Sequence, residues 1–194
     1  MNVGTTGRRI YIGKLAGTSV FDPLGEKVGV IHDVVVTFRL NSTANVIGFV
    51  VEVGPRKRVF LPFTRVTAIE SGSVITTGLL NIRSFNQRPV ETLVISELFD
   101  REVTMNDGSG VVKILDVAMQ QRRPRDWIIS TLHVQRVRTT TLGFKRGGTT
   151  MTVRVDEVSS LLKTDSNQAA TALIQHTEDM KAADLADFIH DLPA

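Results

Sequence analysis

Two aspartates stand in matching surroundings and are the first candidates for chemistry. Asp33 follows the mostly apolar stretch 28–32, and Asp116 follows the similar stretch 111–115. A pair of carboxylates is the usual equipment for general acid–base catalysis. The alternative is that each aspartate accepts hydrogen bonds from backbone amides at a turn or strand end, and recurs because the fold recurs. We favour the structural role, because a duplicated domain would hold the two carboxylates apart.

Histidines and C-terminal carboxylates are the candidates for metal binding. The four histidines show no HExxH or other ligand spacing, so we interpret them as structural or surface residues: His32, His133, His176 and His190. Carboxylate oxygens suit Mg²⁺, and the weak candidates for its ligands are Asp184, Asp187 and Asp191. Their spacing of three and four residues also describes the solvent-facing side of an amphipathic helix, which we favour. We expect no catalytic residue and no bound cofactor in this chain. Mg²⁺ is expected only as a ligand of the full-length protein.

Basic clusters are the candidates for phosphate binding. Arg122, Arg123 and Arg125 surround Pro124, and smaller groups occur at 56–58 and 145–146. Such groups can follow a nucleic-acid backbone, or they can be solvated loop tips. The glycine-rich stretch 143–148 lacks the P-loop pattern, and we expect it to be a hairpin turn.

Composition limits the classes of protein. The chain has 194 residues, 42% of them hydrophobic, and no cysteine, which excludes disulfides, thiolate nucleophiles and cysteine-ligated metals. No apolar run is long enough to span a bilayer and the N-terminus has no signal-peptide pattern, so we expect a cytoplasmic location. The net charge is +3, but the last 31 residues hold six acidic residues against one lysine. A basic body with an acidic C-terminal stretch predicts two kinds of domain.

An internal repeat must position these residues. An offset of 83 residues aligns Asp33 with Asp116, and also Gly25 with Gly108 and Ile31 with Ile114. After residue 134 the matching offset becomes 89, which implies six extra residues in the second copy. Each copy alternates β-branched stretches with turns such as Asp22–Gly25, the pattern of a small antiparallel barrel.

The fold class we predict is mainly β, with two tandem small antiparallel barrels and a short helical C-terminal segment. We expect barrels at 8–80 and 93–163, joined by a linker at 81–92. Leu185, Phe188, Ile189 and Leu192 are spaced as on an amphipathic helix, so residues 164–194 are expected to be helical.

The doubled unit resembles the PRC-barrel family, found in the photosynthetic reaction centre H subunit and the ribosome maturation factor RimM. The residues that carry the resemblance are the opening 15–21, Gly25, the stretch 29–34, the strand 46–51 and Phe60–Phe63. The second copy departs from the pattern, because Val112 replaces the glycine at position 29. Residues 183–193 are similar to the opening of the intracellular N domain of MgtE-type magnesium transporters, and this implies that the chain is the front part of a longer protein.

The resemblance implies a non-enzymatic regulatory module of a magnesium-transporter-related protein that acts by domain docking. Its expected partners are other domains of the same protein or another subunit, including a second copy in a homodimer. Association with a membrane is expected only through parts of the protein beyond this chain. The alternative function is an RNA- or ribosome-binding adaptor like RimM, with Arg122, Arg123 and Arg125 as the nucleic-acid contacts.

Overall fold

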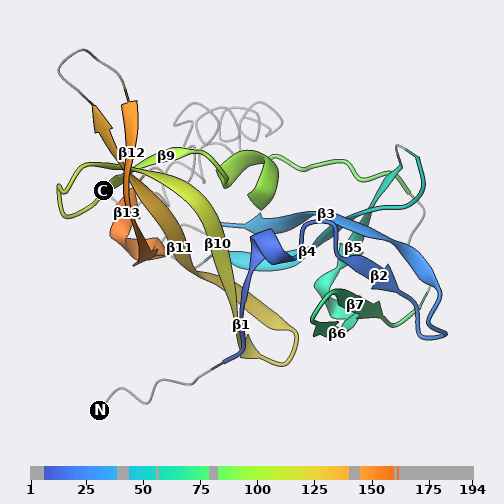
Figure 1. Ribbon diagram of the computed structural model, residues 1–194. Helices are drawn as coiled ribbons and strands as arrows, with labels where there is room; N and C mark the ends of the chain where they lie inside the picture. The colour runs from blue at the N-terminus through green and yellow to red at the C-terminus, as the bar shows by residue number, and fades with distance from the viewer. Residues whose placement is uncertain are drawn as a thin grey trace, which may run out of the picture. The chain divides into compact units, whose positions relative to one another are not determined.

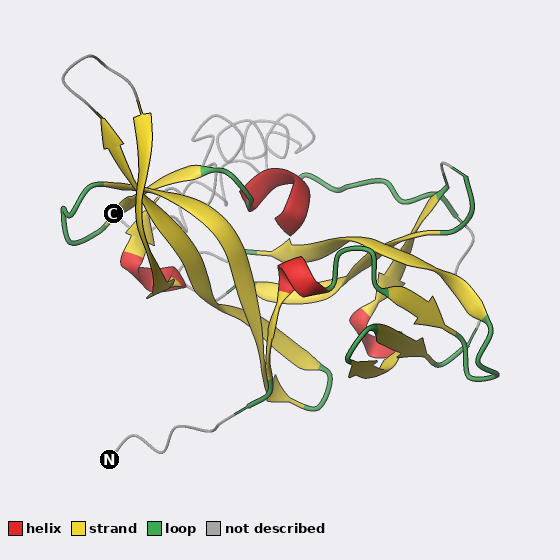
Figure 2. Cartoon of the chain, viewed as in Figure 1, coloured by secondary structure: helices red, strands yellow, loops and turns green. Residues whose placement is uncertain are grey.

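The computed structural model describes residues 7–38, 44–55, 57–78, 83–139, 145–159 and 161. These residues form strands joined by turns and four single-turn helices, so the predicted mainly β fold class is confirmed (Figure 2). The chain divides into two compact units, Met1–Leu161 and Leu162–Ala194. The second unit lies outside the described residues, and with it the predicted C-terminal helices. Within the described part, no helix is long and apolar enough to cross a membrane.

The first β domain is a curved sheet with one short helix. Its elements are β2 (Ser19–Phe21), β3 (Lys27–Thr37), β4 (Asn45–Glu52), β5 (Arg58–Pro62), η2 (Phe63–Arg65), β6 (Val66–Glu70) and β7 (Ser73–Thr76). Successive strands pair antiparallel from β2 to β5 and from β6 to β7, and β2 runs parallel to β7. Asp22 fixes the first turn, because its Oδ1 accepts the amides of Leu24 and Glu26 at 2.9 Å each, while Gly25 takes a φ of 84°.

The second β domain is built around one long hairpin. Its elements are β9 (Glu102–Met105), β10 (Val111–Arg123), β11 (Asp126–Thr139), β12 (Lys145–Arg154), η4 (Val155–Glu157) and β13 (Val158–Ser159). The strands β9, β10, β11 and β12 pair antiparallel in sequence order, and β13 pairs with the free side of β9. The hairpin of β10 and β11 ends in a tight turn in which Arg125 adopts a φ of 64°.

The opening strand of each domain pairs with a strand of the other domain. The strand β1 (Arg9–Tyr11) precedes the first domain but pairs with β10 of the second. The strand β8 (Glu91–Leu93) precedes the second domain but pairs with β3 of the first. Each is followed by one helical turn, η1 (Ile12–Lys14) after β1 and the π-helix η3 (Val94–Leu98) after β8 (Figure 1). The two β domains therefore exchange their first strands.

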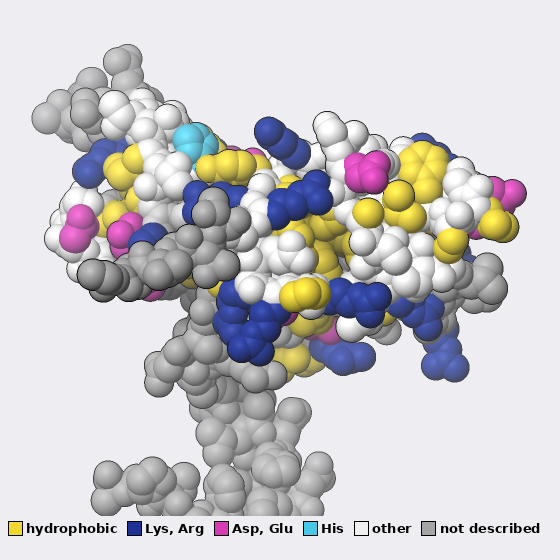
Figure 3. Space-filling model, turned by 90° about the horizontal axis from the view of Figure 1, so that it is seen from below, with side chains coloured by type: hydrophobic (Ala, Val, Ile, Leu, Met, Phe, Trp, Pro, Cys, Tyr) yellow, Lys and Arg dark blue, Asp and Glu magenta, His cyan; other side chains and the backbone are white. Residues whose placement is uncertain are grey.

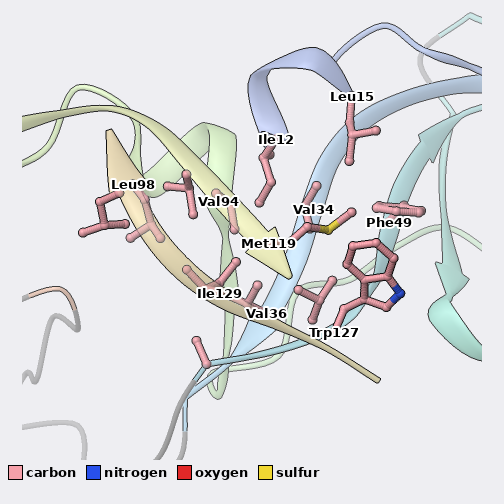
Figure 4. Packing of buried hydrophobic residues seen from close by; sticks show 14 of the residues in the cluster. Ile12, Leu15, Val34, Val36, Phe49, Val94, Leu98, Met119, Trp127 and Ile129 are labelled. Atoms are coloured by element: carbon pink, nitrogen blue, oxygen red, sulfur yellow. The ribbon is translucent and has the colours of Figure 1, made fainter. Parts of the chain in front are cut away.

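The exchange fuses the domains into one sheet and one core. Trp127 and Ile128 of β11 pair with Val46 and Asn45 of β4, which completes a sheet of 13 strands. Buried side chains of both domains form a single cluster (Figure 4). In it, Val34 and Phe49 of the first domain pack with Met119, Trp127 and Ile129 of the second. The two tandem β domains predicted from the sequence are therefore present, and they share one sheet and one core.

Two details of the predicted repeat also change. Phe49 pairs with Leu61 in the first domain, and Leu132 pairs with Val153 in the second. In these registers, corresponding positions of the two domains differ by 83 at β4 and β11 and by 92 at β5 and β12, where the sequence predicts 89. Residues 91 and 92, assigned to the linker from the sequence, lie in β8.

Candidate functional site

The buried carboxylate of Asp33 lies where the two domains meet. The register of β3 against β4 shifts between Ile31 and Asp33, and this bulge turns the Asp33 side chain toward η3. Asp33 is 0% exposed. Its Oδ1 accepts the amide of Val34 at 2.7 Å and the amide of Ile95, in the second domain, at 2.8 Å.

The second oxygen of Asp33 is fully occupied by the same helical turn. Oδ2 accepts the Ser96 amide at 2.9 Å and the Ser96 hydroxyl at 2.6 Å. The first amides of any helix lack partners within the helix, and an anionic acceptor satisfies them. Asp33 therefore caps the first turn of η3 from the opposite domain, and this explains how a carboxylate can be buried without a cation.

Asp116 makes the reciprocal contact. A register shift between Ile114 and Asp116 places it like Asp33, and its Oδ1 accepts the amide of Val117 at 2.7 Å and that of Gly13 at 2.9 Å. Gly13 belongs to η1 of the first domain. A Cβ on Gly13 would lie 2.8 Å from Asp116 Oδ2, so the close approach requires glycine.

The two caps together with β1, η1, β8 and η3 are called the exchange junction below. The carboxylates that the sequence singled out bond backbone amides, as the structural interpretation expects, but besides the adjacent amides of Val34 and Val117 these come from the other domain. Sequence reasoning missed this, because the donors lie 62, 63 and 103 residues away from their acceptors. Asp33 is closed to solvent, so a substrate cannot reach it without opening the junction.

The histidines and carboxylates of the described part do not assemble a metal centre. Within it, no three His, Asp or Glu side chains come close enough to hold an ion. His32 is partly exposed on β3 with its Nδ1 3.9 Å from Glu52 Oε2, and His133 stands opposite Asp116 in the sheet. His176, His190, Asp184, Asp187 and Asp191 lie outside the described residues.

The arginines predicted to bind nucleic acid sit together at one end of the β10–β11 hairpin. Arg122, Arg123 and Arg125 are all exposed, and Arg122 Nε lies 3.7 Å from Asp126 Oδ2. Of the other basic groups, Lys57 and Arg58 are exposed, with Arg58 Nε 3.8 Å from Glu52 Oε2, and the side chains of Arg56, Lys145 and Arg146 lie outside the description. Two further arginines, Arg8 and Arg9, join the hairpin end because β1 pairs with β10.

Comparison with known families assigns each β domain separately. Residues 7–79 match the PRC-barrel domain. Residues 92–164 match the Actinomycetes SH3 domain, so the expectation of a second PRC barrel is wrong. No curated protein matches the chain. Neither family match extends past residue 164, and the similarity of 183–193 to an MgtE-type N domain stays a prediction.

Proposed function

We propose that this chain is a non-enzymatic regulatory and interaction module that acts by docking to other domains or subunits. The observation that carries the proposal is the exchange junction. It uses the two carboxylates most suited to acid–base chemistry as helix caps. It also joins the PRC-barrel and SH3-type domains into one compact unit. The outer faces of such a unit keep fixed positions relative to each other, so a partner can bind to both domains without reorienting them.

The domain types support a role in recognition. SH3 domains are in general small barrels that bind segments of other proteins, and fold alone is weak evidence for function. The buried carboxylate of Asp33 accepts four hydrogen bonds, and those from Ile95 and Ser96 stabilise the junction. We therefore assign a structural rather than a catalytic role to this carboxylate.

The finer proposal places the module in a cytoplasmic, magnesium-transport-related protein. It rests on residues 183–193, whose Asp184-Leu185-Ala186-Asp187 start and Leu192-Pro193 end resemble the MgtE-type N domain. In this proposal the β unit docks on the helical domain or on another subunit, and Mg²⁺ changes that contact. Asp184, Asp187 and Asp191 supply the carboxylates.

We further propose that the two β domains are diverged copies of one module, although they match different families. The supporting observation is their shared registers. Ile31 pairs with Val51 as Ile114 pairs with Val134, and the bulge that carries the aspartate follows in both. The exchange of first strands is likewise reciprocal, as in a dimer whose subunits have been joined.

Limited proteolysis of the full chain tests the magnesium proposal. We expect millimolar Mg²⁺ to slow cleavage within residues 164–194, because a bound cation stabilises the form of the protein that binds it against the form that the protease cuts. In the variant Asp184→Asn/Asp187→Asn/Asp191→Asn the same Mg²⁺ should have no effect.

The control is Asp165→Asn/Glu178→Gln/Asp179→Asn, which removes as many charges from the same segment and should keep the response. Digestion patterns that are the same with and without Mg²⁺ in the unmodified chain would contradict the magnesium proposal and leave the architecture of the β unit untouched.

A further inference from the structure

Five exposed arginines gather where β1 meets the end of the β10–β11 hairpin. Two come from the start of the chain and three from the hairpin: Arg8, Arg9, Arg122, Arg123 and Arg125. The pairing of Arg9 with Gln120, and the bond from the Gln121 amide to the Arg8 carbonyl at 3.0 Å, place both segments side by side. Figure 3 shows the molecule from this side, with Lys and Arg side chains collected over it and few acidic side chains among them. This group is called the arginine edge.

Among the described residues, few acidic side chains compensate the positive charge of the arginine edge. Of its five members, only Arg122 forms an ion pair within the described residues, with Asp126 at 3.7 Å. That pair is half exposed and weak, with 52% of the Arg122 side chain accessible. Several like charges on neighbouring segments raise the local potential and attract an anionic partner.

The chemistry of the edge favours phosphate as that anion. All five cations are arginines, whose planar guanidinium groups bind phosphate oxygens in pairs. A membrane-binding surface would add large apolar side chains to enter the lipid. The exposed large hydrophobic residues of the described part are Leu24, Val90 and Val111, and none of them is at this end of the hairpin.

A folded protein partner fits the edge less well. Protein interfaces usually have an apolar centre within a polar rim. Here Trp127, the large aromatic residue nearest the hairpin end, points into the core and is 4% exposed. A partner that carries charge at every unit along its length matches a group of arginines without an apolar centre better.

We propose that the arginine edge binds the phosphodiester backbone of a nucleic acid, without reading its sequence. The site is composite, because Arg8 and Arg9 enter it from the first domain and the other three from the second. It exists only while β1 stays paired with β10. The proposal is independent of the magnesium response.

Binding of the full chain to short duplex RNA and duplex DNA of mixed sequence, measured against salt, tests the proposal. Five phosphate contacts predict a slope of log affinity on log salt of about −4 to −5, or a loss of roughly 10²- to 10³-fold between about 50 and 200 mM salt. Comparison of the RNA and DNA duplexes shows which of them supplies the backbone in solution. Vesicles of anionic lipid form a third arm.

Charge-reversal variants locate the site. Arg123→Glu/Arg125→Glu should weaken binding at least about tenfold at low salt and flatten the slope by about 2, since two ionic contacts are lost. The matched control Lys27→Glu/Lys57→Glu changes the net charge equally at exposed positions elsewhere, and should weaken binding much less. Circular dichroism melts of each variant check that the fold is kept.

The single variant Arg9→Glu tests the composite nature of the edge. It should weaken binding in the same direction and flatten the slope by about 1. No binding to either duplex, binding to lipid vesicles alone, or equal losses for the edge and control pairs would overturn the proposal. An Arg9→Glu variant that binds like the unmodified chain would overturn the composite site.

Discussion

At the scale of single residues, the two aspartates have the same role but unequal environments. Asp33 is fully buried and accepts four hydrogen bonds, whereas Asp116 is half buried and two such bonds are seen to it. An asparagine at position 33 would turn its N–H₂ group toward backbone donors, because both oxygens of Asp33 accept, whereas an asparagine at position 116 can keep its carbonyl oxygen in the place of Oδ1 and loses mainly the charge. We predict that Asp33→Asn lowers the free energy of unfolding by about 3–5 kcal/mol and Asp116→Asn by about 1–2 kcal/mol. Urea denaturation of both variants measures the difference.

Asp107→Asn is the control for that comparison, because Asp107 caps a fully exposed turn through the Ser109 amide at 2.8 Å. Its stability should change by less than about 1 kcal/mol. Equal effects of the Asp33 and Asp116 substitutions would show that burial of the capping carboxylate does not determine how much it contributes to the free energy of unfolding.

The close contact between Gly13 and Asp116 gives a second prediction at this scale. A Cβ at position 13 would press on the Asp116 carboxylate at 2.8 Å, so Gly13→Ala should destabilise the protein by about 1–3 kcal/mol. In an Asp116→Ala background the same substitution should be nearly neutral, because the opposing atoms are gone. A double-mutant cycle in urea measures this coupling, and additive effects would contradict the contact.

At the scale of elements, the strands that carry long β-branched runs could be predicted from the sequence. The β-branched stretches 28–40 and 127–138 indicate strands, and β3 and β11 cover most of them. Alternation predicts that a strand exists and which face is buried, but not which strand lies beside it. Strands β1 and β8 have three residues each and carry almost no pattern of their own. Their exchange follows from long-range packing, and with it the composition of the arginine edge and the capping partners of Asp33 and Asp116.

The exchanged strands predict that the two halves hold together without the chain that connects them. A protease site inserted between Asn86 and Gln87, both exposed, would separate β1–β7 from β8–β13 on cleavage. We expect the cut protein to elute as one species in gel filtration, because the β1–β10, β8–β3 and β4–β11 pairings cross the cut. Denaturant should be needed to part the fragments.

A matched insertion between Asp107 and Gly108, in an exposed turn within the second domain, provides the comparison for cleavage efficiency. Fragments that separate under native conditions, each keeping its β circular dichroism, would show that the domains are independent and that the exchange contributes little.

At the scale of the whole molecule, the shared core predicts a single folding unit. Trp127, the sole tryptophan, lies in β11 with its ring centroid 5.7 Å from that of Phe63 in the first domain. Its fluorescence therefore reports on the contact between the domains, whereas far-UV circular dichroism reports on all the strands. Because one cluster of buried side chains spans both domains, we expect the two signals to follow one transition.

Core truncations on the two sides of the junction test this cooperativity. Ile31 and Ile129 are 1% and 0% exposed, one in each domain, and replacing either by alanine should cost about 2–5 kcal/mol. In a cooperative unit, each variant shifts the midpoint of the fluorescence transition and the midpoint of the circular dichroism transition equally. This holds for Ile31→Ala and for Ile129→Ala. The exposed Val90→Ala, in the loop between the domains, should move neither. The contrary outcome is that Ile31→Ala shifts only part of the circular dichroism transition and leaves the Trp127 fluorescence transition unchanged. The first domain would then have unfolded without disturbing the core around Trp127, and the two domains would be separate folding units.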